Sequence, residues 1–390
     1  MSVFVHQIAC QVPQYPYDQD TLRQKMLQWL APDRRTARII NRIYKESGIQ
    51  TRYSVLPDTG ITLGLSDGPC EKTAGTGHRN ALYTESARRL YVDVSRQVLA
   101  ECRDIGPEQI THLITVSCTG FFNPGPDYEI IRQVPLNPTV QRFHIGFMGC
   151  YGAFPAMRLA QSICQADPGA CVLIVDVELC SLHLQIQSDL NSILGGALFA
   201  DGAAALLVNS QSPNPAKPAL ELNHFSTTLL PNSETDMAWT IGDHGFEMIL
   251  SPQVPRLIEA NLLDVLHPSL QQWGHSVSDI HHWAVHPGGK AILDRIEALL
   301  MLEDQLTISR SVLRDYGNMS SVTILFVLQM LLNQTAQSTQ EPILAMAFGP
   351  GLTMEMGLLH KVSSAPLKVS THSKAQRTSE SCVSTGDKLQ

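Results

Sequence analysis

Three residues in glycine-rich turns carry side chains that could act together on an acyl group. Cys150 stands in FMGCYG, His286 in AVHPGG and Asn318 in DYGNMSS. A thiolate needs a cationic or hydrogen-bonding neighbour, and a developing oxyanion needs preorganised donors. Cysteine, histidine and asparagine held together therefore predict nucleophilic chemistry at a carbonyl carbon. Taken singly, each residue also fits a structural role in a turn, a core or a helix cap.

Cys150 stands where a strand is expected to become a helix. Phe143, Ile145 and Phe147 alternate as in a buried strand. The apolar residues after the turn recur at helical spacing: Ala156, Met157, Leu159, Ala160 and Ile163. Unpaired amide groups in a first helical turn favour an anion, so we predict a depressed pKa and a nucleophilic thiolate for Cys150. A buried structural cysteine is the alternative, since free cysteines are among the most buried residues.

Composition narrows the class of protein. The chain has 390 residues, 44% of them apolar, and a formal net charge of -8. This length predicts two domains or one large double unit, and the acidic charge argues against binding to nucleic acid or anionic membranes. Nine cysteines without a CxxC pair indicate reduced thiols and no structural zinc site. Without a signal-peptide pattern or an apolar run long enough to span a membrane, we expect a cytoplasmic protein.

Alternating strands and helices predict an α/β fold made of two similar halves. The expected strands are 3–8, 112–120 and 171–180, with a pair around 349–351. The expected helices are 21–30, 34–47, 84–102, one through Asn191, 257–266 and 320–332, and residues 281–300 are expected to form a strand, a turn and a helix. A Pro-, Ser- and Asn-rich segment near residue 215 suggests an N-terminal half, 1–215, and a C-terminal half, 216–361. Residues 362–390 are expected to be a disordered tail.

Five segments, taken together and in order, resemble the signature blocks of type III polyketide synthases, the chalcone synthase superfamily. They are GFMGCYGAFPAMRLA, ALFADGAAALLV, AVHPGGKAILD, DYGNMSS and AFGPGLTMEMGLLH, and the resemblance covers residues 1–361. It implies a thiolase-like fold with a five-layered αβαβα core. It also implies a homodimeric acyltransferase that uses acyl-CoA and malonyl-CoA directly, without a metal or a redox cofactor.

The resemblance implies roles for single residues. Cys150 matches the acyl-accepting nucleophile, and His286 and Asn318 match the pair that drives malonyl decarboxylation. Phe199 matches an aromatic gatekeeper, whereas Met248 replaces the other one. Further positions match the lining of the cavity: Cys118, Asn123, Cys180, His183, Trp239, Ser320, Gly349 and Pro350. Lys45 and Arg52 lie near the family's contacts with the CoA phosphates.

Departures from the plant pattern indicate the starter and the product. Cys180 and His183 replace threonines, Trp239 replaces a glycine, and Ala347 opens AFGPG where plant enzymes have GFGPG. This cavity favours a fatty acyl starter, as in microbial alkylresorcinol and alkylpyrone synthases. We predict that Trp239 bends the growing polyketide toward aldol closure, which gives an alkylresorcinol. The alternative product is a pyrone, formed by lactone closure. The alternative role of Trp239 is core packing alone.

Two other classes of enzyme remain open at this stage. A ketoacyl synthase III-like condensing enzyme shares the Cys, His, Asn set but not the combined blocks. A Cys-His-Asn hydrolase is a remote alternative, because the spacing from Cys150 to His286 fits the papain-like order.

Overall fold

The computed structural model describes residues 1–58, 60, 63–64, 74–335 and 338–363. Within them, nine strands form one sheet in the order β11, β12, β13, β8, β1, β7, β6, β4, β5. The strand bounds are β1 Phe4–Gln11, β4 His112–Ser117, β5 Gln141–Gly146, β6 Cys171–Leu179, β7 Asp201–Asn209, β8 Ala219–Leu229, β11 His282–Val285, β12 Gln340–Gly349 and β13 Thr353–Val362. Two separate two-stranded sheets stand apart: β2 (Tyr15–Asp18) pairs with β3 (Thr51–Ser54), and β9 (Met237–Gly242) forms a hairpin with β10 (Gly245–Leu250).

The two halves of the sheet repeat one pattern of pairing and meet at β1. In the first half β4 is parallel to β6, while β6 and β1 are both antiparallel to β7. In the second half β11 is parallel to β12, while β12 and β8 are both antiparallel to β13. β1 contacts β8 only at Phe4 and Val5. This repetition agrees with the predicted fold class of two similar halves.

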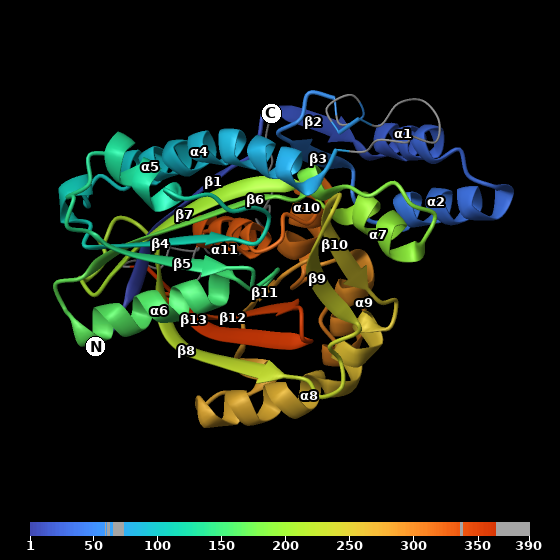
Figure 1. The fold of residues 1–390 in the computed structure, drawn as a ribbon. Coiled ribbons are helices and arrows are strands. Elements are labelled where there is room, and N and C mark those ends of the chain that lie inside the picture. Colours follow the sequence, from blue (N-terminus) through green and yellow to red (C-terminus); the bar gives the residue numbers. More distant parts are fainter. Residues whose placement is uncertain (59, 61–62, 65–73, 336–337, 364–390) are drawn as a thin grey trace, which may run out of the picture.

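Helices complete a layered arrangement. Their bounds are α1 Gln19–Leu30, α2 Arg34–Glu46, α4 Thr76–Glu101, α5 Pro126–Gln133, α6 Ala153–Ala166, α7 Leu190–Leu198, α8 Val254–Gln272, α9 Lys290–Leu300, α10 Thr307–Tyr316 and α11 Val322–Asn333. Figure 1 shows α4 and α5 on one outer face and α8 and α9 on the other, with α6 and α11 between the halves. Buried residues of α6 and α11 share one core with strands of both halves. The layers therefore follow the expected order αβαβα.

Several element boundaries differ from the prediction for local reasons. A helix runs through Asn191, but this helix, α7, begins only at Leu190, and the segment before it holds a short 3-10 turn, Cys180–His183. Asp189 caps α7 by accepting a hydrogen bond from the Ser192 amide at 3.0 Å. The helix expected at 84–102 begins eight residues earlier, at Thr76, because its first turns lack the apolar periodicity used to find it.

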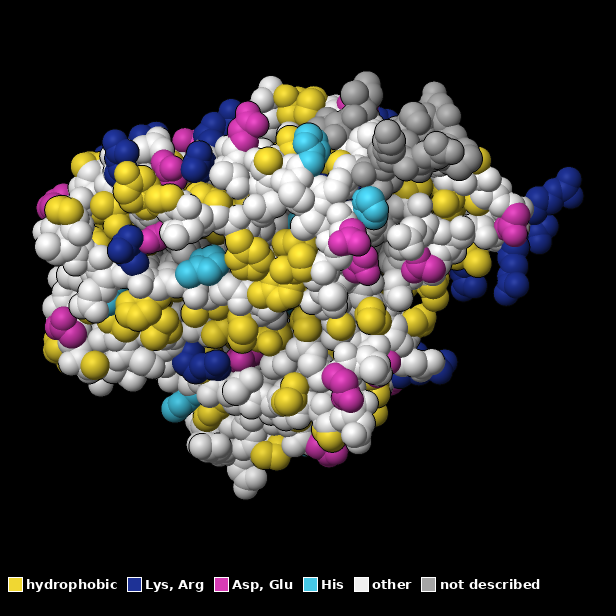
Figure 2. Space-filling view, viewed as in Figure 1, with side chains coloured by type: hydrophobic (Ala, Val, Ile, Leu, Met, Phe, Trp, Pro, Cys, Tyr) yellow, Lys and Arg dark blue, Asp and Glu magenta, His cyan; other side chains and the backbone are white. Residues whose placement is uncertain are grey.

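The strand that leads to Cys150 is exposed, contrary to the buried pattern predicted for it. β5 is an edge strand, paired only with β4, and Phe143 on it is 38% exposed. Phe147 lies beyond the strand end, with a φ of 57°. In Figure 2 hydrophobic side chains gather in the middle of the face where β5 ends. The alternating apolar residues of this strand are therefore exposed to solvent in the single chain.

The two remaining expectations concern the C-terminal tail and membrane-spanning helices. Of the predicted tail, residues 364–390 lie outside the described part of the chain. Among the described helices none has the length and apolar character needed to cross a membrane.

Candidate active site

Cys150, His286 and Asn318 line a single small cavity of about 50 Å3. Each comes from a different turn: Cys150 precedes α6, His286 follows β11, and Asn318 separates α10 from α11. The lining also includes most of the residues predicted for it: Cys118, Cys180, Phe199, Trp239, Met248, Ser320 and Pro350. The structure therefore brings the three chemically active residues together in one chamber, called the catalytic chamber below.

Cys150 is held in a tight turn that requires glycine beside it. Gly149 has a φ of +81°, and a Cβ there would lie 2.5 Å from Pro350. A Cβ at Gly349 would lie 3.5 Å from the Cys150 amide nitrogen, so Gly349 packs behind the turn. Gly349 therefore shapes the chamber through the backbone.

The expected depression of the Cys150 pKa is wrong for the ligand-free chain. α6 begins at Ala153, with Gly152 as its cap, so Cys150 lies before the first helical turn. Desolvation raises the pKa of Cys150 to about 12, a shift that hydrogen bonding by Ser320 opposes and the charge of Glu178 reinforces. Desolvation of the sulfur therefore favours the thiol over the thiolate.

His286 is a neutral imidazole without hydrogen-bond partners. It is 1% exposed, and neither Nδ1 nor Nε2 has a partner among the described residues. Burial lowers its pKa to about 3. Its backbone N–H donates to the Met346 carbonyl at 2.8 Å, which fixes the residue at the end of β11. An unpartnered buried imidazole that lines a cavity is ready to exchange a proton or a hydrogen bond with a ligand.

The Asn318 amide is oriented by its neighbours. Its Oδ1 accepts from the Ser320 amide at 2.9 Å and from the Thr323 hydroxyl at 3.4 Å. Its Nδ2 donates to the Gly288 carbonyl at 3.2 Å, in the turn that carries His286. Because an amide nitrogen has two hydrogens, one remains for a ligand in the chamber. Asn318 is therefore fixed as a hydrogen-bond donor beside His286.

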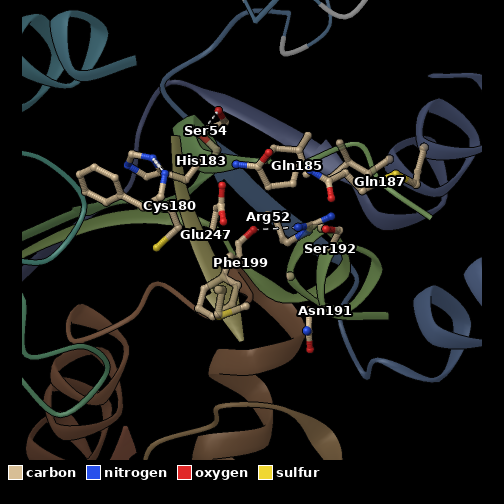
Figure 3. A pocket seen from close by; sticks show the side chains of 18 of the residues that line it. Arg52, Ser54, Cys180, His183, Gln185, Gln187, Asn191, Ser192, Phe199 and Glu247 are labelled. Atoms are coloured by element: carbon tan, nitrogen blue, oxygen red, sulfur yellow. Dashed lines mark hydrogen bonds between the residues drawn. The ribbon is translucent and has the colours of Figure 1, made fainter. Parts of the chain in front are cut away.

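A second, larger cavity of about 500 Å3 adjoins the catalytic chamber. The two share Cys180, Phe199, Trp239 and Met248 in their linings. Figure 3 shows this larger cavity, whose wall mixes apolar side chains with polar ones such as Gln187 and Asn191. The shared side chains, including both predicted gatekeepers, therefore stand between the two spaces.

His183 and Asn123 lie outside the catalytic chamber. His183 lines the larger cavity. Its Nδ1 accepts from the Phe246 amide at 3.0 Å, so its Nε2 donates to the Thr119 carbonyl at 2.7 Å. Asn123 is exposed on the segment between β4 and α5, and so its predicted place in the lining is not observed in the single chain.

The two predicted contacts for CoA phosphates differ in position. Lys45 is exposed in the last turn of α2, and Figure 2 shows basic side chains projecting at the edge where α2 lies. Arg52 is only 6% exposed and donates to Gln19 Oε1 at 3.0 Å and to the Phe199 carbonyl at 2.7 Å. Figure 3 shows the hydrogen bond from Arg52 to the Phe199 carbonyl. Its guanidinium supports the backbone at Phe199 and also lines the larger cavity, so its contact with a CoA phosphate stays a prediction.

Sequence reasoning missed two buried acids beside the chamber. Asp176 and Glu178 are both fully buried on β6, and Glu178 accepts hydrogen bonds from the Cys118 amide and thiol. The segment CVLIVDVELC, predicted above as the strand 171–180, is apolar apart from these two acids. Two carboxylates at positions i and i+2 of such a strand were the available signal, because they face the same side.

The comparisons with known proteins cover most of the chain. Residues 3–212 match the family model "Chalcone and stilbene synthases, N-terminal domain", and residues 221–363 match the C-terminal one. The crystal structure of PKS-I from the brown alga Ectocarpus siliculosus is similar, with a TM-score of 0.82 and 29% identity over 93% of this chain and 98% of that one. This chain belongs to the type III polyketide synthases.

A second solved structure agrees with this assignment. It is the C-terminal type III polyketide synthase domain of Steely1, a type I/III hybrid from Dictyostelium, with a TM-score of 0.81 and 26% identity over 93% of this synthase and 100% of that domain. The synthase is therefore a transferase-type enzyme with the thiolase-like fold. In the described part of the chain, no group of three His, Cys, Asp or Glu side chains could hold a metal ion.

Proposed function

We propose that this synthase loads a fatty acyl group from acyl-CoA onto Cys150 and extends it with malonyl-CoA. The observation that carries the proposal is the convergence of Cys150, His286 and Asn318 on one small chamber beside a much larger cavity. A volume of 50 Å3 holds little more than a water molecule or two. A growing chain must therefore occupy the neighbouring 500 Å3, a size typical of ligand pockets.

In the loading step, the neutral pair Cys150 and His286 reacts without a preformed thiolate. His286 takes the thiol proton as the sulfur attacks the acyl thioester carbonyl, which forms the Cys150 thioester. The departing CoA sulfur then recovers that proton from His286 as free CoA. This general-base route follows from the direction of both pKa shifts, which disfavour an ion pair at rest.

In the extension step, His286 and Asn318 act as hydrogen-bond donors. Malonyl-CoA loses carbon dioxide, and the electrons of the broken bond become an enolate whose oxygen accepts from the imidazole N–H and the Asn318 amide. The enolate carbon attacks the Cys150 thioester, forms a carbon–carbon bond and expels the Cys150 thiolate. The extended chain on CoA can then be transferred back to Cys150 for the next cycle.

Cyclisation to an alkylresorcinol is the proposed final step, with Trp239 as the residue that directs it. Trp239 lines both cavities, and its Nε1 donates to the Cys118 carbonyl at 2.8 Å. Edge contacts with His183 and Phe246 further fix the ring. A rigid indole at the junction restricts how a tetraketide folds, which favours closure between carbons. Lactone closure to a pyrone is the alternative outcome.

We also propose that two copies of the synthase associate across the exposed apolar face at β5. Phe121, Phe143 and Met148 are 39%, 38% and 36% exposed there. Large apolar side chains grouped on one face favour a protein partner, and a second copy presents the same face in a symmetric dimer. Lys45 remains the proposed contact for a CoA phosphate.

One assay tests the proposed reaction. The purified synthase is incubated with acyl-CoA starters of increasing chain length and isotope-labelled malonyl-CoA, and products are identified by mass. Labelled products with a fatty acyl tail are expected. If no starter supports malonyl-dependent product, the proposal fails.

The role of Trp239 is tested by Trp239→Gly in the same assay. A shift from resorcinol toward pyrone is expected, and an unchanged ratio would assign Trp239 to core packing alone.

A further inference from the structure

The predicted gatekeeper Phe199 is the residue at which α7 ends. It is the C-cap of that helix, and its amide donates to the Gly195 carbonyl at 3.2 Å. A helix leaves its last carbonyl groups without partners inside the helix, and buried carbonyl groups need partners elsewhere. The position of the gatekeeper backbone therefore depends on the groups outside α7 that supply those partners.

Two side chains from the N-terminal elements bind carbonyl groups at this helix end. Gln19, the first residue of α1, donates from Nε2 to the Ala197 carbonyl at 2.8 Å. Arg52, on β3, donates from Nη1 to the Phe199 carbonyl at 2.7 Å (Figure 3). The two side chains also bond each other, because Arg52 Nε donates to Gln19 Oε1 at 3.0 Å. Gln19 and Arg52 are only 5% and 6% exposed, and together they are called the helix-end clamp below.

The amide of Gln19 is fixed in one orientation. Its Nε2 carries two hydrogens, of which one goes to Ala197 and the other to Ser47 Oγ at 3.0 Å. The Ser47 hydroxyl in turn donates to the Tyr44 carbonyl at 2.8 Å, at the end of α2. Since Oε1 already accepts from Arg52, a reversed amide would lose these bonds. The clamp is therefore anchored to α2 as well as to α7.

An arginine suits this helix end for two physical reasons. Carbonyl groups at a helix C-terminus carry partial negative charge, which stabilises a nearby cation. Burial lowers the pKa of Arg52 and Tyr44 opposes that shift, but an arginine side chain keeps its proton in proteins. The planar guanidinium also presents donors in a fixed fork, here to Gln19 and to the Phe199 carbonyl. A lysine would keep the charge without the fork.

The clamp also contacts the turn that carries Asn318. The backbone N–H of Asn318 donates to the Leu198 carbonyl, and its carbonyl accepts from the Ala200 amide, both at 2.9 Å. Gly317 packs on the stem of Arg52, since a Cβ at Gly317 would lie 2.8 Å from Arg52 Cγ. A displaced Arg52 would therefore shift the end of α7 relative to this turn.

We propose that Arg52 and Gln19 are positioning residues that set the Phe199 ring at the junction of the two cavities and thereby control access to Cys150. Phe199 lines both cavities, whereas Arg52 lines the larger one. The clamp acts through the backbone of Phe199. The proposal rests on the proposed function only where an acyl thioester is used to measure it.

Alkylation of Cys150 tests the clamp without any thioester. The rates of modification by a small reagent, iodoacetamide, and a bulky one, N-phenylmaleimide, are measured on the Cys150 peptide by mass. Their ratio cancels changes in thiol reactivity and reports the width of the entrance, and Phe199→Ala gives its value without the gatekeeper ring. Arg52→Lys is expected to move the ratio about tenfold in the same direction, because displacements of about 1 Å have effects of this order or larger. An unchanged ratio in either variant refutes the proposed role.

Loading of Cys150 separates positioning from phosphate binding. An acyl N-acetylcysteamine thioester has the reactive group of acyl-CoA but no phosphate, so any contact of Arg52 with a CoA phosphate is absent. If Arg52 positions the gatekeeper, Arg52→Gln and Arg52→Lys both lower the acylation rate about tenfold with both starters. A loss confined to Arg52→Gln and to acyl-CoA would assign Arg52 to phosphate binding alone and refute the clamp, as would unchanged rates throughout.

The variant Gln19→Met tests the second member of the clamp. It removes the bonds to Ala197 and to Arg52 Nε but leaves the Arg52 bond to Phe199. We expect the alkylation ratio to shift in the direction of Arg52→Lys, by a smaller factor. A ratio equal to that of the unmodified protein would refute the role of Gln19.

Lys361→Met is the matched control for a general loss of stability. Lys361 on β13 is also a buried cation, 1% exposed, that donates to a backbone carbonyl, that of Leu331, at 2.9 Å. It lines neither cavity. Urea unfolding should show a destabilised protein with an unchanged alkylation ratio, and a shift equal to that of Arg52→Lys would refute the clamp. If neither thioester acylates the unmodified protein, the proposed reaction fails, while the alkylation ratio still decides on the clamp.

Discussion

Two buried histidines near the catalytic chamber differ in what their ring nitrogens contact. His183 is 5% exposed and His286 is 1% exposed, and burial lowers their pKa values to about 4 and about 3. Both nitrogens of His183 are used, one by the Phe246 amide and one by the Thr119 carbonyl. Neither nitrogen of His286 has a partner within the described chain.

This difference separates a structural histidine from a chemical one. Burial shifts both pKa values in the same direction, so a shifted pKa alone does not identify the catalytic residue. An unsatisfied buried polar group costs about 1–3 kcal/mol, and in native proteins each one calls for an explanation. The proposed explanation at His286 is a ligand in the chamber, whereas at His183 both nitrogens already have partners in the chain.

The largest expected effect comes from exchanging each histidine for glutamine. His286→Gln should lower kcat/KM by about 10²–10⁴-fold, the usual contribution of a general acid or base, with little loss of stability. His183→Gln should lose about 1–3 kcal/mol of stability because a buried donor or acceptor loses its partner, while activity stays within about tenfold. Product formation and urea unfolding measure the two quantities. Equal loss of activity in both variants, or a lower stability of His286→Gln, would contradict the assignment of a structural role to His183 and a chemical role to His286.

Asn318→Asp should have the next largest effect, because it removes the amide donor while keeping the shape. We expect malonyl decarboxylation to fall about 10²–10³-fold, as for loss of an oxyanion-hole donor, with loading of Cys150 by the starter preserved. Release of labelled carbon dioxide and the mass of the acylated protein separate the two steps. Asn333→Asp, at the exposed end of α11, is the matched control. Equal loss of loading and decarboxylation would contradict a donor role specific to the enolate.

The parts of the site that could be predicted are those with a short sequence pattern of their own. Glycine-rich turns after apolar segments marked Cys150, His286 and Asn318, and the family resemblance assigned most of the chamber lining, because such turns have strong local signatures. Helix periodicity likewise found α11 and the apolar face of α4. These features need only neighbours in the chain.

The parts that failed depend on tertiary surroundings. The pKa of Cys150 is governed by desolvation, which no turn motif records, and the burial of Arg52 follows from hydrogen bonds to Gln19 and the Phe199 carbonyl in distant segments. The exposure of β5 follows from its place at the edge of the sheet. The roles of Asp176 and Glu178 could not be predicted, because their hydrogen-bond partners lie on other elements and the strand around them is otherwise apolar.

Acid sensitivity tests the feature that the two histidines share. Each has a folded pKa below its unfolded value of about 6.5, so the unfolded chain binds more protons between those values. Stability is therefore fully present above about pH 6.5 and decreases as pH falls toward 4. His286→Gln should reduce that slope by up to about 1.4 kcal/mol per pH unit, the value for one proton. Urea unfolding at pH 7, 6 and 5 measures it. An unchanged slope would show that His286 is solvated or charged.

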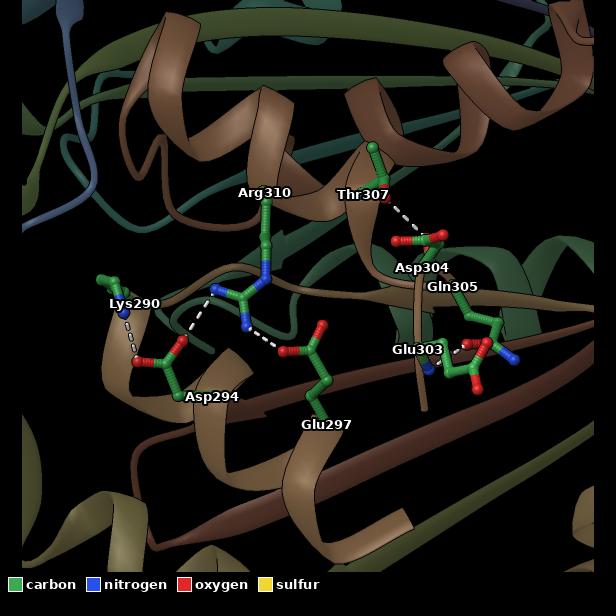
Figure 4. A network of polar contacts seen from close by, with 8 residues as sticks. All are labelled: Lys290, Asp294, Glu297, Glu303, Asp304, Gln305, Thr307 and Arg310. Carbon is green, nitrogen blue, oxygen red and sulfur yellow. Dashed lines mark hydrogen bonds and ion pairs between the residues drawn. The ribbon is translucent and has the colours of Figure 1, made fainter. Parts of the chain in front are cut away.

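The smallest expected effect concerns the ion pairs that join the helices beside His286 and Asn318. Arg310 on α10 bonds Asp294 and Glu297 on α9, and Lys290 bonds Asp294 (Figure 4). These side chains are about 30–50% exposed, and such pairs contribute little. Arg310→Gln should therefore cost no more than about 1 kcal/mol in urea unfolding and leave kcat within about twofold.

Arg295→Gln provides the matched control for this last prediction, because Arg295 joins α9 to Glu259 on α8, away from Asn318. The backbone bond from His286 to Met346 and the Asn318 bond to Gly288 hold the two catalytic turns from inside. If those buried contacts position the site, both arginine variants should have similar kcat. A tenfold loss in Arg310→Gln alone would instead mean that the position of His286 relative to Asn318 depends on the surface network.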